Sequence, residues 1–188
     1  MRATHNRGCG GNRRFALEYF LNNAPTEYVM WLDSDDMLLP SAIERMNHII
    51  KHNQADIIIT NIWHEYTHEG KNIILADKSR TWLHGKIYRT QFLIDSGVQF
   101  PIFFKTNEDL AYNLALYAHD PESYLIDEEV YYFRKMPNSV TKNIDTFQKC
   151  VSTDYIEAIY WAYEHFIVAK HPLDTIMIGN IISCYNYY

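Results

Sequence analysis

The chain has 188 residues, which suits one domain, and its 47% hydrophobic and 21% charged residues are typical of a globular protein. A formal net charge of -6 argues against non-specific nucleic-acid binding, which needs a basic surface. Cys9, Cys150 and Cys184 are odd in number and widely spaced, so neither a disulfide framework nor a thiolate zinc site is indicated. This cysteine pattern fits a reducing, cytoplasmic setting, and no apolar run approaches the ~20 residues of a membrane span. A place at the inner face of the membrane would need a partner or a further segment.

The first predicted elements are a helix over residues 13–21, entered from a glycine-rich turn at 8–11, and a strand over 28–32. The strand is short, wholly apolar and bounded by polar residues, a pattern typical of a buried central strand in a parallel sheet. This alternation of helix and strand predicts an α/β fold.

The next predicted helix opens at Pro40 and Ser41, because proline suits a first helical turn and Ser41 with Glu44 matches a capping box. Its expected apolar face consists of Ala42, Ile43, Met46, Ile49 and Ile50. A strand over 56–60 follows, and its β-branched core again predicts a buried position.

The later elements are predicted from shorter patterns. A hairpin is expected between 61 and 76, turning near 69–72. The others are a helix over 87–96 ending at Gly97, a helix from Asn107 to about His119, strands over 124–126 and 130–133, and a mostly helical region over 145–188 broken at His171-Pro172. We therefore expect one domain over residues 1–144 and a helical extension over 145–188 packed on it.

Three carboxylates directly follow the first predicted strand, in the sequence Asp33-Ser34-Asp35-Asp36. Open α/β sheets bind ligands beyond the carboxyl ends of their strands, and Mg²⁺ or Mn²⁺ prefers oxygen ligands. The ordinary alternative is a solvated turn in which aspartate caps the next helix. A second acidic pair, Glu108 and Asp109, is predicted in a first helical turn, where the helix dipole favours acids whatever their function.

Several short segments occur in an order that resembles the family 2 glycosyltransferases, which are inverting enzymes of the GT-A fold that use nucleotide-diphosphate sugars. The segments are Asn6-Arg7-Gly8 with Arg13, Trp31 to Asp36, His84 to Arg89, Phe100-Pro101, Asn107 to Asp109, Tyr132 to Arg134 and Asn138 to Thr141. No single segment is specific, but their order and spacing are. The resemblance implies a Rossmann-related mixed sheet flanked by helices, with a helical C-terminal segment.

The resemblance also implies a donor site for a nucleotide-diphosphate sugar, with a UDP-sugar first among the candidates. Asp33 would face the ribose and Asp35 would bind Mn²⁺ or Mg²⁺, while Asp36 could share the metal or take it instead. The other implied donor contacts are Arg13, Arg134 and Ser139, whose guanidinium and hydroxyl groups suit phosphate oxygens.

On the acceptor side, the resemblance implies that one carboxylate takes the proton of the attacking hydroxyl. Asp109 is the first candidate for this base and Glu108 the second. His84 and Lys86 would line a pocket for a saccharide or lipid-linked acceptor, as in polysaccharide biosynthesis, although a histidine beside a tryptophan is often structural.

Two departures from the family pattern bear on activity. The family normally begins with a strand-helix-strand unit that holds the nucleotide base, whereas the match here starts near Met1, so an N-terminally truncated domain is expected. The sheet edge left bare by that loss would favour self-association. In Asn12-Arg13-Arg14, only Arg13 fits the family's Ala-Arg-Asn. A truncated relative that binds metal or nucleotide sugar without catalysis therefore stays open.

Two other chemistries are disfavoured. The sequence from His64 to His68 matches the His-Glu-x-x-His pattern of zinc proteases, which requires a helix. A strand is predicted there, and residues four apart on a strand are ~13 Å from each other. An aspartate-nucleophile phosphatase also places Asp-x-Asp after an apolar strand, but Met37 stands where that family has threonine or valine, and its later acidic pair is absent.

Overall fold

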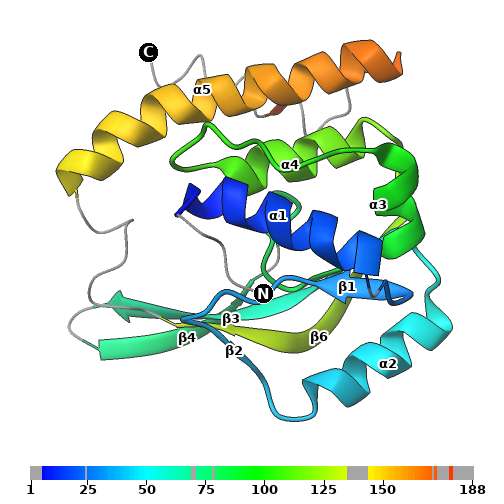
Figure 1. The fold of residues 1–188 in the computed structure, drawn as a ribbon. Helices are drawn as coiled ribbons and strands as arrows, with labels where there is room; N and C mark the ends of the chain where they lie inside the picture. Colours follow the sequence, from blue (N-terminus) through cyan, green and yellow to red (C-terminus); the bar gives the residue numbers. More distant parts are fainter. Residues whose placement is uncertain are drawn as a thin grey trace.

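A computed structural model describes residues 6–23, 25–68, 71–77, 79–134, 144–170, 172 and 178–179. These residues form a mixed six-stranded sheet with helices on both faces, which confirms the α/β class (Figure 1). The main path of the sheet runs β1 (Tyr28–Met30), β5 (Lys86–Arg89), β3 (Ile57–His68), β6 (Ser123–Phe133) and β2 (Met37–Leu38), and β4 (Lys71–Asp77) also pairs with β3. The β3–β6 pair is parallel, and the other described pairs are antiparallel.

The helices form layers on the two faces of this sheet (Figure 1). One face is covered by α1 (Gly8–Asn23), α3 (Thr90–Ser96) and α4 (Glu108–Tyr117), and α5 (Ile144–Ala169) packs on the far side of α4. The opposite face is covered by α2 (Ala42–His52). Each face has its own apolar core as a result. Among the described residues, no helix combines the length and the apolarity that a membrane crossing requires.

Strand β1 lies at an end of the sheet order, so its predicted central, parallel position is wrong. It pairs only with β5, in antiparallel register, among the described residues. Its apolar run has a different cause, because Val29 packs into the core under α1 and α4 while Tyr28 and Met30 pack into the core over α2. A strand covered on both faces reads as continuously apolar even at the edge of a sheet.

Strand β3 is the central strand that the β-branched residues predict. Ile57, Ile58 and Ile59 have no exposed surface, and the strand continues to His68 as one arm of the predicted hairpin with β4. The turn at 69–70 lies outside the described residues. The His-Glu-x-x-His segment therefore lies on a strand, as expected, and a zinc-protease site is excluded.

Several local predictions fail where tertiary contacts decide the conformation. Gly8–Gly11 begin α1 and do not form a preceding turn, and residues 87–89 belong to β5 because that strand pairs with both β1 and β3. The segments at 124–126 and 130–133 form one strand, β6, whose register with β3 shifts midway. The helix after β5 ends as predicted, with Gly97 in the left-handed region at φ 63°.

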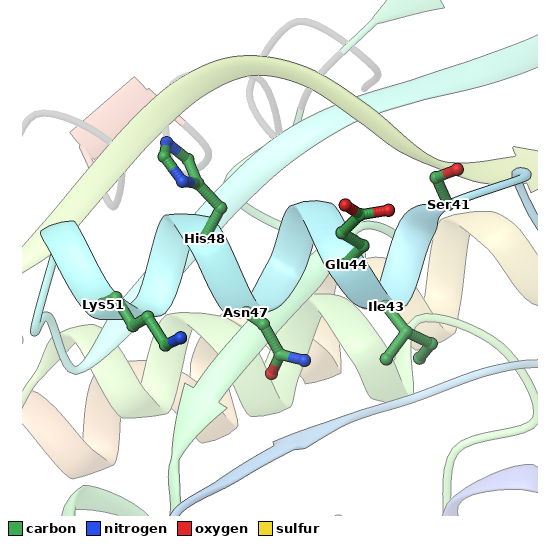
Figure 2. Close-up of a pocket in the computed structure, with 6 residues that line it drawn as sticks. All are labelled: Ser41, Ile43, Glu44, Asn47, His48 and Lys51. Carbon is green, nitrogen blue, oxygen red and sulfur yellow. The ribbon is translucent and has the colours of Figure 1, made fainter.

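The predicted helix caps at Ser41 and Asn107 are wrong. Both residues adopt left-handed backbone conformations, φ 62° and φ 63°, and neither side chain caps its helix. A capping side chain normally belongs to a residue in the β region, from which it can reach the first free amides. Helix α2 nevertheless buries Ala42, Met46 and Ile49 as expected, whereas Ile43 is 60% exposed and points away from the core (Figure 2).

Candidate active site

The acidic turn follows β1, where the sequence places it. The amide of Asp36 donates to the carbonyl of Asp33 over 3.1 Å, which closes a tight turn. Asp36 is buried, Asp33 is partly buried and Asp35 is exposed. The turn thus directs two of its three carboxylates into the protein.

Arg13 of α1 joins the acidic turn to the first turn of α4. Its guanidinium donates to both carboxylate oxygens of Asp33, at 2.8 and 3.1 Å, and also to Glu108. Burial disfavours the charged guanidinium, but Asp33 and Glu108 outweigh that effect and raise the pKa of Arg13. Burial also opposes ionisation of Asp33, yet His84 and Arg13 together lower the pKa of its carboxyl to about 2.

Asp36 is held by a separate set of donors. The Tyr131 hydroxyl donates to Oδ2 over 2.6 Å, and the backbone amide of Arg134 donates to Oδ1 over 3.0 Å. The same tyrosine oxygen accepts from the amide of Asp33 over 3.2 Å, so Tyr131 fixes both ends of the turn. Burial raises the pKa of Asp36 in spite of these donors. The buried carboxylate is therefore short of positive charge.

His84, just before β5, completes a set of possible metal ligands. Its Nε2 lies 3.3 Å from Oδ2 of Asp33 and 3.8 Å from Oδ2 of Asp36. Ligand atoms from Asp33, Asp36 and His84 all lie within 4.8 Å of one another. Two carboxylates and an imidazole suit a divalent cation, and a cation would supply the charge that Asp36 lacks. These residues fit a metal, whereas Asp35 lies outside the group and its role as a ligand stays a prediction.

The sequence did not identify His84 as a neighbour of the acidic turn. The family resemblance places it in the acceptor pocket, and no spacing links it to residues 33–36, because the fold brings them together across 51 positions. The ring of His84 contacts Tyr131 and Phe133, with centroids 5.3 and 5.0 Å away, so aromatic packing fixes its orientation.

The acidic pair lies in the first turn of α4, as predicted, and its two members differ. Glu108 is 7% exposed, and burial together with the charge of Asp109 raises the pKa of its carboxyl. The Glu108 carboxylate pairs with Arg13. Asp109 is only half-buried, and its Oδ1 accepts from the amide of Leu110 over 2.8 Å. Asp109 is thus the member of the pair that no described cation binds directly.

Two further candidates occupy defined places. Arg134 donates through Nε to the carbonyl of Asp35, so its side chain reaches the acidic turn. Ser139 lies outside the described residues. Lys86 has no exposed surface, its Nζ has no hydrogen-bond partner in the described part of the chain, and burial lowers its pKa to about 7. An acceptor would reach Lys86 only after a rearrangement, so its acceptor role stays a prediction.

The residues of this site do not line the surface hollow on α2. That hollow, of about 670 Å³, is formed by Ser41 and side chains of α2 alone: Ile43, Glu44, Asn47, His48 and Lys51 (Figure 2). None of the candidate catalytic, metal-binding or nucleotide-binding residues contributes to it. Figure 2 shows them leaving the helix in different directions, without convergence on one point. The acidic turn therefore remains the candidate site.

Comparisons with known proteins agree with the fold. A crystal structure of S. aureus TarS 1–349 in complex with UDP-GlcNAc matches with a TM-score of 0.60 and 20% identity, over 84% of this chain and 48% of that chain. A structure of TarS 1–349 matches with a TM-score of 0.57 and 17% identity, over 97% and 60%. At this identity the likeness shows the fold alone, and it confirms the predicted GT-A-like class. The chain spans about half of the TarS chain in the first match.

Sequence comparisons give the family. No curated protein matches the chain. The sequence model described as Glycosyl transferase family 2 matches residues 1–106, which is more than half of the 188 residues. This chain therefore belongs to glycosyl transferase family 2.

Proposed function

We propose that the acidic turn and the first turn of α4 form the two sides of a site for sugar transfer from a nucleoside-diphosphate sugar to an acceptor hydroxyl. The observation that carries this proposal is the bridge through Arg13, which joins Asp33 on one side to Glu108 on the other. The S. aureus TarS structures contain UDP-GlcNAc and UDP, which supports a uridine nucleotide as donor.

On the donor side, Asp33, Asp36 and His84 would hold Mn²⁺ or Mg²⁺. When bound, the metal neutralises charge on the departing diphosphate. The protein keeps its ligands in place through Tyr131, which donates to Asp36 and accepts from the backbone of Asp33. Arg134 donates through Nε to the carbonyl of Asp35. Its guanidinium is therefore near enough to the turn to offer its remaining donors to phosphate oxygens.

On the acceptor side, Asp109 would accept the proton of the attacking hydroxyl. The acceptor oxygen then bonds to the anomeric carbon while the bond from that carbon to the diphosphate oxygen breaks, so a single displacement inverts the configuration. Glu108 suits this role less well, because its carboxylate is buried against Arg13. A general base contributes about 10²–10⁴ in rate.

Binding without transfer is the alternative function. Both carboxylate oxygens of Asp33 accept from Arg13, so a metal ion must share this ligand with a fixed guanidinium. Such competition weakens the metal site, and a weakly held metal would do less to neutralise the departing diphosphate, so the rate of transfer would fall.

Calorimetry and a transfer assay with the whole chain separate these functions. UDP should bind in the presence of Mn²⁺, and UDP-GlcNAc should release UDP with inverted sugar configuration in the product. Asp36→Asn should weaken Mn²⁺-dependent UDP binding by at least about 10–100-fold, the loss that follows when an outer partner of a metal ligand is removed. Asp109→Asn should keep that binding and lose about 10²–10⁴ in rate.

A matched control is Asp95→Asn, which changes an exposed acid on α3 that accepts from Gln91 and lies outside the proposed site. If wild-type protein binds no UDP with Mn²⁺, the proposed site is wrong. If UDP binds but no sugar is released or transferred, the binding function holds. If Asp109→Asn is as active as Asp95→Asn, Asp109 is not the base.

A further inference from the structure

One carboxylate of α5, that of Asp154, is hydrogen-bonded to residues 105 and 106, which lead into α4. The backbone amides of Lys105 and Thr106 each donate to Oδ2 of Asp154 over 2.9 Å, and the Thr106 hydroxyl donates to the same oxygen over 3.2 Å. Hydrogen bonds to an ionised acceptor are stronger than neutral ones. Asp154 thus fixes both the path of the backbone at 105–106 and the rotamer of Thr106.

This fastening lies directly before a backbone conformation that few residues adopt. Asn107 is left-handed at φ 63°, and its side chain donates to the hydroxyl oxygen of Thr106 over 3.2 Å without capping the helix. The left-handed conformation costs free energy in any residue that carries a Cβ, even though asparagine tolerates it better than most. The contacts from Asp154 through Thr106 to Asn107 therefore hold a turn that would not be stable alone.

The turn sets the direction of the acidic pair. The carbonyl of Asn107 accepts the first helical hydrogen bond, from Ala111 over 3.0 Å, so the orientation of Asn107 is also that of the first turn of α4. That turn carries Asp109 and Glu108. Glu108 forms an ion pair with Arg13, and Arg13 forms a second ion pair with Asp33. Polar contacts, together with the backbone of residues 106–108, thus connect α5 to the acidic turn.

Helix α5 is anchored in the apolar core next to this contact. Ala158, Ala162 and Phe166 are almost fully buried in the same core as α4, and α5 runs along the far side of α4 from the sheet (Figure 1). Asp154 lies at the start of this packed stretch, on the same helix. The family match ends at residue 106, so this support comes from a part of the chain that the match does not include.

We propose that Asp154 is a positioning residue for sugar transfer: from α5 it holds residues 105–107 so that Asp109 faces the acceptor hydroxyl. This inference rests on the proposed function. Asp154 has no described contact with Glu108 or Asp109, so it acts through the loop. A purely structural fastener would contribute to stability alone, whereas a positioning residue changes the rate while donor binding stays intact.

The experiment compares Asp154→Ala, Asp154→Asn and Thr106→Val with Thr106→Ser, which keeps the hydroxyl. Glu164→Gln is the matched control, because it removes an exposed acid from the same helix. Asp154→Ala should lower kcat by up to about 10²-fold, the effect of small misplacement at a catalytic group. The kcat of Asp154→Asn should lie between those of Asp154→Ala and wild type. Thr106→Val should lower kcat, and Thr106→Ser should keep the wild-type kcat because it retains the hydroxyl. Donor KM and Mn²⁺-dependent UDP binding should match those of Glu164→Gln.

A second measurement decides the question without turnover. Amide exchange followed by NMR should be faster in Asp154→Ala than in Glu164→Gln at Lys105, Thr106 and the first turn of α4, with unchanged exchange at β3. If exchange in the first turn of α4 is unchanged, or if kcat equals that of the control, Asp154 does not position the acidic pair. Failure of wild-type protein to transfer sugar would refute the proposed function alone, and the exchange data would still test the support from α5.

Discussion

Replacing Arg13 by glutamine should destabilise the protein far more than a surface charge loss does. Arg13 and Glu108 are 16% and 9% exposed in their side chains, so the change leaves a buried carboxylate without its cation. Loss of one partner from a buried pair costs about 3–5 kcal/mol. Asp33 is 33% exposed, and water screens its half of the bridge to about 0–1 kcal/mol. Because glutamine keeps one donor, we expect a net loss of about 2–4 kcal/mol in unfolding free energy.

The loss of unfolding free energy in Arg13→Gln should depend on pH. The pKa of Asp33 is depressed to about 2, so its contribution in wild type is present near neutral pH and is lost as the pH falls toward 2. The pKa of Glu108 is already raised by burial and by Asp109, and removal of Arg13 raises it further. At acid pH, Glu108 in the variant is therefore protonated, and the cost of a buried, unpaired carboxylate disappears. The effect of Glu108 makes the stability loss of Arg13→Gln smaller near pH 4 than near pH 7, and the effect of Asp33 reduces it further as the pH falls from about 4 toward 2.

Urea unfolding of Arg13→Gln and Arg14→Gln measures this difference. Arg14 is the adjacent arginine, and its exposed pair with Glu18 at 3.0 Å should be worth about 0.3–0.5 kcal/mol. Adding Glu108→Gln to Arg13→Gln should recover part of the loss, because it removes the unpaired charge. If the two arginine variants have equal stability near pH 7, or if the deficit does not shrink at acid pH, the bridge has no structural role.

Two other substitutions test the packing around the site. Gly10→Ala should cost about 1–3 kcal/mol or more, because its Cβ would press against the carbonyl oxygen of Pro101, while Gly179→Ala, where a Cβ meets none of the described residues within 4 Å, should leave the Tm unchanged. Lys86→Met should stabilise the protein by a few kcal/mol near neutral pH, because burial lowers the pKa of Lys86 to about 7 and its charged form is disfavoured in the folded state. This gain should shrink as the pH rises from 7 toward the ordinary lysine pKa of 10.5, and a constant gain would mean that folding does not lower the pKa of Lys86.

The elements that the sequence predicted well are those whose local and tertiary preferences agree. Ile57 to Ile59 favour a strand by their β-branched side chains, and the fold places them at the centre of the sheet. Residues 87–89 fit a helical pattern, but pairing with β1 and β3 makes them a strand. The edge position of β1 could not be inferred, because burial on both faces hides the difference between edge and central strands.

The site was predictable as two acidic clusters but not as a connected structure. Residues 33–36 and 108–109 follow strand and helix boundaries that the sequence marks. Their connection depends on Arg13, which lies 95 positions from Glu108, and on the fold that brings α1 between them. Hydrogen bonds over such separations leave no periodic signal in one sequence. The same holds for His84 and for Asp154, whose partners come from other elements.

The charges of the site bear on how a nucleotide would bind. The pKa of Cys9 on α1 is raised by burial and by Glu108, with smaller contributions from Asp33 and Asp109, so these acids converge on one region. Arg13 is already engaged by two of them. A diphosphate entering this region meets an excess of negative charge, and repulsion in a partly buried site is only weakly screened by salt. On the proposed function, a divalent cation is therefore needed for the nucleotide to bind as well as for the diphosphate to leave, and UDP without metal should bind poorly even to the intact site.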